Sequence, residues 1–202
     1  VEKKIKSELA DMRDNDREKY ENVFHDFGRT MKYSIFQSYG MTKDLLSDLM
    51  IFHSAKLDKM VTLDEYIDAA SDDQKSIFFA TGESVEALAK MPIVTSVTDR
   101  GYDVLLCTED VDELCLMAIG EYKEHELKNV GGGDLGLDTD EEKDAAEAAN
   151  KANDDLLKAM CEDLDGKVVK VTVSPRATDA AACITTEGPV SLEMEKLSGS
   201  SL

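Results

Sequence analysis

The stretch that decides the fold is Gln74-Lys75-Ser76-Ile77-Phe78-Phe79-Ala80-Thr81-Gly82-Glu83-Ser84. Its apolar run, Ile77–Ala80, is typical of a strand buried on both faces, and Gly82 suits a sharp exit into a following helix. A second apolar run, Val104–Cys107, follows after roughly twenty residues, which is enough chain for a right-handed helical crossover. The two strands are therefore predicted to be parallel. The helices expected between them lie near Val85–Ala89 and Pro92–Asp99.

Helical patterns surround this pair of strands. Apolar residues recur three or four apart from about Asn15 to Met31, which predicts a long amphipathic helix, and a second helix is predicted from Thr42 to Met50. Thr62 and Glu65 have capping-box spacing and open a short third helix. A further helix at Val111–Gly120 and a weaker strand near Glu126–Val130 follow the second strand. The expected fold class is α/β (mixed α+β overall), a small layered domain with parallel strands preceded by helices.

Gly131-Gly132-Gly133-Asp134 marks a boundary, because consecutive glycines and the acidic run Asp138–Glu142 neither continue a strand nor start a packed helix cheaply. We divide the chain into residues 1–130, the α/β region with its helical lead-in, a linker at 131–140, and residues 141–202, a truncated α+β domain. Within residues 141–202 a single long helix is predicted from Ala145 to Leu164. The strands and the helix expected after it are Lys167–Val173, Ala182–Thr186 and Val190–Leu197.

Composition narrows the class of partner. The 202 residues are 42% hydrophobic, as in a globular protein, and carry a formal net charge of −20. This excess argues against nucleic acid and against anionic membrane surfaces, because both are bound through Lys and Arg. The simplest role for the acidity is solubility.

Cysteine usage and the absence of long apolar runs indicate a cytoplasmic protein. Cys107, Cys115, Cys161 and Cys183 have no Cys-x-x-Cys spacing, as expected in a reducing compartment. Neither a signal peptide nor an apolar run of about 20 residues is present. The chain begins at Val1 without Met and ends in Ser-Gly-Ser-Ser-Leu, so we expect an excised fragment.

Motifs for chemistry are sparse. Gly82 stands alone without the further glycines of a phosphate-binding loop, and His25, His53 and His125 lack metal-spaced partners. No cysteine has a neighbouring base that would activate a thiolate. One alternative stays open, a ligand-binding or enzymatic domain whose site lies at the carboxyl ends of the strands, near Thr81–Ser84 and Thr108–Asp110.

The helix Val111–Gly120 supports a binding hypothesis. On a helical wheel Val111, Cys115, Ala118 and Tyr122 form the buried stripe, while the remaining large apolar residues lie beside it. Flexible Met and Leu side chains next to carboxylates suit a surface that grips varied unfolded chains. The ordinary interpretation is that they pack against the sheet or a neighbouring domain. The candidate client-binding residues are Glu113, Leu114, Leu116 and Met117.

Several segments together resemble the HtpG chaperones, the bacterial branch of the ninety-kilodalton heat-shock family. The resemblance covers most of the chain, from about residue 1 to Leu197. Its segments are Phe27-Gly28-Arg29, Leu45-Leu46 with Phe52-His53-Ser54, Thr62-Leu63-Asp64-Glu65-Tyr66, Gln74-Lys75-Ser76-Ile77, Gly101–Leu106, Asp112-Glu113-Leu114 and Met194-Glu195-Lys196.

This resemblance implies a function as well as a fold. It implies the second half of a middle domain plus the start of a C-terminal domain, a segment that contacts partly unfolded clients and relays ATP-driven motion in a full-length homodimer. The fragment itself is expected to be monomeric or weakly associated, to hold no cofactor or metal, and not to be an enzyme, because the ATP-binding domain and a catalytic-loop arginine lie outside it. ATP and Mg²⁺ are expected in the full-length protein, and the fragment's own N-terminal and C-terminal domains are its expected neighbours.

Overall fold

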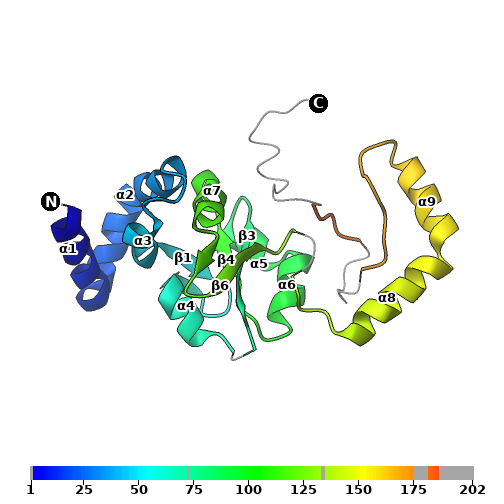
Figure 1. The fold of residues 1–202 in the computed structure, drawn as a ribbon, viewed down its shortest axis with the longest axis horizontal. Coiled ribbons are helices and arrows are strands. Elements are labelled where there is room, and N and C mark those ends of the chain that lie inside the picture. Colours follow the sequence, from blue (N-terminus) through cyan, green and yellow to red (C-terminus); the bar gives the residue numbers. More distant parts are fainter. Residues whose placement is uncertain (1, 72, 133–134, 175–181, 187–202) are drawn as a thin grey trace. The chain divides into compact units, whose positions relative to one another are not determined.

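The computed structural model describes residues 2–71, 73–132, 135–174 and 182–186 (Figure 1). It divides into two compact units, Val1–Gly133 together with Ala182–Leu202, and Asp134–Ala181. The division falls inside the expected glycine-rich linker, and within the first unit the Thr186 amide donates to the Gly131 carbonyl at 3.0 Å. The domain boundaries themselves stay a prediction.

The first unit alternates helices and short strands. Its helices are α1 Glu2–Asn15, α2 Arg17–Gln37, α3 Lys43–Leu46, the 3-10 turn η1 Ser47–Leu49, α4 Leu63–Ala69, α5 Val85–Ala89, α6 Pro92–Thr98 and α7 Asp110–Ile119. Its strands are β1 Ile51–Ser54, β2 Lys59–Thr62, β3 Ser76–Thr81, β4 Leu105–Cys107, β5 Glu121–Tyr122 and β6 His125–Asn129. The mixed α+β class is as expected.

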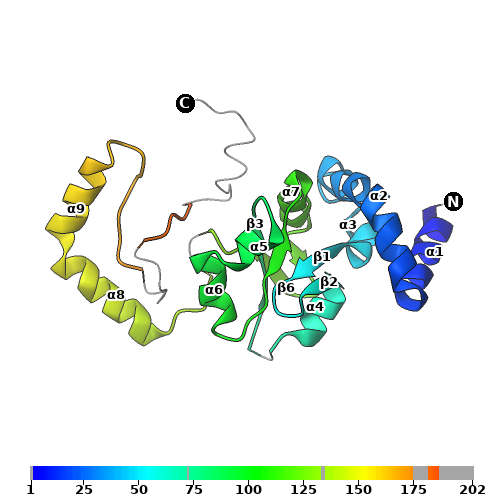
Figure 2. The ribbon, with the colours of Figure 1, turned by 180° about the vertical axis from the view of Figure 1, so that it is seen from behind.

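The strands form one mixed sheet in the order β2-β1-β4-β3-β6-β5. The predicted parallel pair is confirmed, since β3 and β4 run in the same direction with Phe79 opposite Leu105. On its other side β3 pairs with β6, also in parallel. β3 is buried almost throughout because it has a parallel neighbour at each edge and helices pack against the sheet (Figure 2).

The antiparallel pairs at the two ends of the sheet were not foreseen, and one of them joins β5 to β6. β1 and β2 form a hairpin with Phe52 opposite Val61, and β1 also pairs with β4. The predicted helix from Thr42 to Met50 is correspondingly shorter, because α3 and η1 end at Leu49 and the chain turns extended at Met50. The helix α1 was also not foreseen.

The sequence of α2, which precedes the sheet, determines where this helix begins and which of its faces is buried. Asp16 caps it by accepting from the Lys19 amide at 3.3 Å, and its buried face carries Tyr20, Phe24, Gly28, Lys32 and Ile35. A Cβ atom at Gly28 would lie 2.7 Å from the Phe24 ring. The glycine is therefore required by the ring that covers it.

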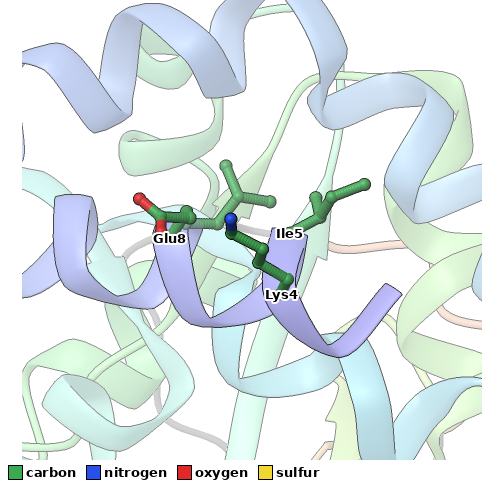
Figure 3. A pocket seen from close by; sticks show the side chains of 4 residues that line it. Lys4, Ile5 and Glu8 are labelled. Atoms are coloured by element: carbon green, nitrogen blue, oxygen red, sulfur yellow. The ribbon is translucent and has the colours of Figure 1, made fainter. Parts of the chain in front are cut away.

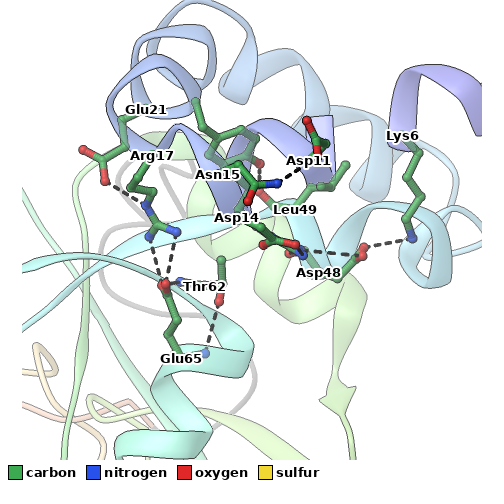
Figure 4. A network of polar contacts seen from close by, with 12 residues as sticks. Lys6, Asp11, Asp14, Asn15, Arg17, Glu21, Asp48, Leu49, Thr62 and Glu65 are labelled. Atoms are coloured by element: carbon green, nitrogen blue, oxygen red, sulfur yellow. Dashed lines mark hydrogen bonds and ion pairs between the residues drawn. The ribbon is translucent and has the colours of Figure 1, made fainter. Parts of the chain in front are cut away.

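A polar network joins α2 to the sheet (Figure 4). Thr62 and Glu65 form the predicted capping box of α4, with the Glu65 amide 3.1 Å from Thr62 Oγ1 and the Thr62 amide 2.7 Å from Glu65 Oε2. The Arg17 guanidinium donates to both carboxylate oxygens of Glu65, at 3.1 and 2.9 Å. The Tyr20 hydroxyl donates to the Leu49 carbonyl inside the core. The starts of α2 and α4 are thus held together by hydrogen bonds rather than by apolar packing alone.

The second unit contains α8 Asp140–Ala152 and α9 Asp154–Asp163. The expected single helix from Ala145 to Leu164 was wrong, because the chain leaves helical geometry at Asn153. The expected strand Lys167–Val173 is also absent. Val173 instead exchanges hydrogen bonds with the Asn150 side chain, at 2.8 and 3.1 Å, since alternation alone supplies no neighbouring strand.

Two remaining expectations concern the end of the chain. Residues 182–186 form no strand in the described structure, contrary to the prediction, and they are largely exposed. The predicted helix Val190–Leu197 lies outside the described residues.

The four thiols differ in how far they are buried, and this difference predicts how fast each one reacts. Burial raises the pKa of Cys107 well above its ordinary value and raises that of Cys115 to about 12, whereas Cys183 is exposed and Cys161 half-buried. A thiol reagent at pH 8 should therefore modify two cysteines quickly and the other two only on unfolding. Because these pKa values are raised in the folded state, the contribution of both thiols to stability should be full below about pH 9 and decline above it.

Mass spectrometry of the alkylated protein with and without urea identifies the modified cysteines. Rapid labelling of Cys107 or Cys115 in native buffer would contradict the burial of these two thiols in the core.

Candidate functional site

Helix α7, which carries the predicted binding residues, is fixed at both ends by local chemistry. At its start Glu109 and Asp112 form a capping box, in which the Glu109 amide donates to Asp112 Oδ2 at 3.0 Å. At its end Gly120 adopts a left-handed conformation with φ 69°, which glycine tolerates best. The helix therefore occupies nearly the predicted range.

The burial of α7 differs from the expected stripe. Leu116, expected outside the buried stripe, is fully buried, as are Val111, Cys115 and Ile119. The reason is that α7 packs against both α2 and the sheet, so more of its surface is covered. Leu114 is half-buried, and Met117 is 41% exposed. Of the four candidate residues, only Leu114 and Met117 thus offer apolar surface to a partner.

Glu113 is also buried, at the carboxyl end of the parallel strands. Its Oε2 accepts from the Thr81 hydroxyl of β3 and its Oε1 from the Asn129 amide of β6, each at 3.3 Å. The carboxylate therefore ties α7 to the ends of both strands. Its position supports the helix that carries Leu114 and Met117.

The alternative ligand site at the strand ends gains no support from the geometry. A Cβ at Gly82 would lie 2.8 Å from Leu88 of α5, so this glycine permits close packing of a helix. The Ser84 hydroxyl accepts from the Ala87 amide and caps α5. Among the described residues no group of acidic, His and Cys side chains could hold a metal ion.

Lys32 on α2 is the charged centre of the contact between α2 and α7. Its ammonium lies 2.5 Å from Asp112 Oδ1 and 2.9 Å from Glu109 Oε2, and its side chain is almost fully buried. The Phe24 and Phe52 rings lie 5.2 and 5.1 Å from the ammonium, within range of a cation–π interaction. The buried cation thus has carboxylates and aromatic faces around it.

The pKa values of Lys32 and Asp112 are set by two opposing effects, burial and ion pairing. Burial alone would lower the pKa of Lys32, but the Asp112 and Glu109 carboxylates outweigh it and raise the pKa. Burial raises the pKa of Asp112 even though Lys32 opposes this shift. Sequence reasoning did not single out Lys32. Its place on the same helical face as Phe24, Gly28 and Ile35 was the available signal.

Exposed apolar side chains gather on α2 and in the turn that follows it. Tyr33 and Phe36 are exposed, with ring centroids 6.1 Å apart, while Tyr39 is 93% and Met41 83% exposed. The turn lies against the C-terminal end of α7, because the Lys43 ammonium donates to the Ile119 carbonyl at 3.0 Å. Both views place α2 beside α7 (Figures 1 and 2).

A separate hollow of about 340 Å³ lies on α1 (Figure 3). It is lined by Lys4, Ile5, Glu8 and Leu9, all from successive turns of one helix. Within the described part of the chain, no residue of another element lines this hollow, so it offers no catalytic arrangement there.

The family model described as Hsp90 protein matches residues 1–201. The chain belongs to the Hsp90 family. This assignment agrees with the resemblance seen in the sequence.

Relatives and a solved structure place the chain within the Hsp90 family more closely. It is 44% identical over 197 residues to "Chaperone protein HtpG" of Clostridium perfringens, covering 98% of this chain and 31% of that protein. The Bacillus subtilis protein of the same name is 41% identical, with 98% and 32% covered. The fold is similar to the middle domain of a Plasmodium falciparum protein described as a heat shock protein, with a TM-score of 0.58 and 27% identity over 63% of this chain and 53% of that one. The chain spans about a third of the length of these curated relatives.

The buried ion pair of this Hsp90-family segment gives a stability prediction. Lys32→Met leaves Asp112 buried without its main partner and should cost roughly 3–5 kcal/mol of unfolding free energy. The double variant Lys32→Met with Asp112→Asn should recover a large share of that loss, because Asn keeps the capping acceptor without the charge. Urea unfolding followed by circular dichroism measures the coupling. With Asp112→Asn measured alone as well, losses of the two single variants that add up to the loss of the double variant would show that the two side chains are not coupled.

Proposed function

We propose that this chain contacts partly unfolded client proteins through an apolar surface on α7 and α2, as one segment of an Hsp90-family chaperone. The observation that carries the proposal is Met117, a large flexible apolar side chain left exposed on a helix whose other apolar residues are mostly buried. Leu114 adjoins it one turn earlier on the same helix and is half-buried. Glu113 and Leu116, the other two candidates, contribute by holding the helix in place.

The chemistry of this surface suits a changing set of partners. Methionine adapts its shape readily, and its thioether is polarisable, so it packs against different apolar groups without a fixed geometry. The scaffold below it is rigid by contrast, since Lys32, Asp112 and Glu113 hold α7 to α2 and to the strand ends. A firm base with an adaptable surface is what weakly specific binding requires.

The role in the whole protein belongs to the same proposal. We propose a cytoplasmic homodimer in which ATP and Mg²⁺ bind a region of the protein other than this chain. Motion driven there would reach α7 through α2, because Arg17 of α2 donates to the Met60 carbonyl of the hairpin strand β2 and Lys32 of α2 pairs with Glu109 and Asp112 at the start of α7. The described residues include no helix long and apolar enough to cross a membrane.

Removing the apolar surface should remove the binding. We expect Leu114→Ser with Met117→Ser to lower the suppression of light scattering from a chemically denatured model client by several-fold. The matched control is Met91→Ser on the chain before α6, where the methionine is 39% exposed. The control variant should act as the wild-type chain does.

Circular dichroism and thermal unfolding must accompany this assay, because Leu114 is half-buried and its loss costs some stability. A folded double variant that suppresses aggregation fully would overturn the proposal.

We further propose that the chain alone neither binds nor hydrolyses ATP. Gly82 serves packing and Ser84 serves capping, so neither is available as a phosphate cradle. Isothermal titration of the chain with ATP and Mg²⁺ should show only heats of dilution, after subtraction of a titration with Mg²⁺ alone. A saturable heat with defined stoichiometry would instead favour a ligand-binding α/β domain.

A further inference from the structure

The turn between α2 and α3, residues 38–42, is held rigidly by hydrogen bonds. The Gly40 amide donates to the Ile35 carbonyl at 3.0 Å and the Met41 amide to the Ser38 carbonyl at 3.1 Å. The Ser38 hydroxyl also lies 2.9 Å from the Thr42 hydroxyl. The backbone of this turn therefore has a defined shape, although two of its side chains are almost fully exposed.

Tyr39 occupies an unfavourable conformation within the turn. Its φ of 54° lies in the left-handed region, which costs a residue with a Cβ about 1 kcal/mol and which Asn or Gly tolerates better. The ring gains almost no burial in return, and neither does the Met41 side chain. The fold thus positions a large aromatic and a large thioether side chain in solvent at a conformational cost.

The turn adjoins the end of α7 that carries Met117. A Cβ atom at Gly40 would lie 2.7 Å from the Ala118 carbonyl oxygen, so only glycine allows this close approach. The ammonium of Lys43 holds the next carbonyl of α7, that of Ile119. The turn therefore lies beside the C-terminal end of α7, which places the exposed Tyr39 and Met41 in the same region of the molecule as Met117.

The charges around this surface favour a cationic partner. Of the neighbouring basic side chains, Arg29 pairs with Asp110 at 2.8 Å, Lys32 with Glu109 and Asp112, and Lys123 with Asp64 at 2.6 Å. The charge of Lys43, whose ammonium donates to a carbonyl, is offset by that of the exposed Asp44 next to it. Glu121 and Glu124, exposed just after α7, form no ion pair within the described residues. These two carboxylates leave an acidic excess in this part of the first unit.

We propose that the turn at residues 38–42 binds unfolded segments in which an arginine or lysine adjoins a bulky apolar residue. The exposed ring of Tyr39 would hold the cation over its face, Met41 would pack against the apolar neighbour, and Glu121 and Glu124 would add long-range attraction. The inference rests on the proposed client-binding function and assigns to that surface a class of preferred segment.

The test compares two short unstructured fluorescent peptides, one of Leu, Phe, Ser and Arg and the other with every Arg replaced by Gln. Fluorescence anisotropy with the 202-residue chain should show tighter binding of the arginine peptide, and salt should reduce the difference. Tyr39→Asn should weaken the arginine peptide about fivefold and largely abolish the preference. Met41→Gln should weaken both peptides, and Ile5→Gln, at an exposed apolar residue of α1, should change neither.

The variant Tyr39→Asn separates binding from folding, because Asn accepts the left-handed conformation. Its melting temperature should equal or exceed that of the wild type, and a marked fall would overturn the inference by giving the ring a structural role. Wild-type affinity of both turn variants for the arginine peptide would overturn it as well. If either of these results is found and the suppression of aggregation still depends on Leu114 and Met117, only the inference about the turn is refuted. A wild-type chain that neither binds a peptide nor suppresses aggregation would refute the proposed client-binding function as well.

Discussion

The burial of one ammonium group organises the first unit. Lys32 cannot enter the protein interior unless carboxylates and hydrogen-bond acceptors meet it there, because an unpaired buried charge costs several kcal/mol. Asp112 and Glu109 supply that charge from the start of α7, and this fixes how α7 lies along α2. Since α7 also packs on the sheet, the position of its exposed residues follows from the same requirement. Such a pair adds little net stability, yet it penalises every other placement of the helix strongly.

The elements of the fold that sequence reasoning predicted are those determined locally. β3 was evident from its apolar run, α4 from the spacing of Thr62 and Glu65, and the parallel pair from the length of the crossover. The β1–β2 hairpin escaped although its pairing is local, because its connection, residues 55–58, contains no glycine to mark the turn and Asp58 takes the left-handed conformation. The pairing of β1 with β4 escaped because β4 lies far along the chain. The prediction of a strand at Lys167–Val173 was wrong because an alternating pattern forms a strand only beside another strand. Among the described residues none lies next to this segment.

The sequence predicted the helix that carries the candidate site, but it did not predict which side chains of that helix are exposed. The pattern of α7 indicated an excess of apolar side chains, and that excess is partly explained by Leu116, which a second packing partner buries. Which side chains remain exposed depends on how two helices and a sheet meet, and a single helical wheel does not contain that information. Tyr39 and Met41 gave no periodic signal because they lie in a turn, in which Tyr39 as well as Gly40 takes a left-handed conformation.

The central position of β3 has a consequence for how the chain is made. Its partners β4 and β6 both follow it, so β3 leaves the ribosome well before either edge can be covered. Until β6 emerges, an apolar ribbon with open backbone groups is available to other nascent chains, which is the situation in which misassembly begins. Slow translation between β3 and β6 would therefore prolong the time during which both edges of β3 are uncovered.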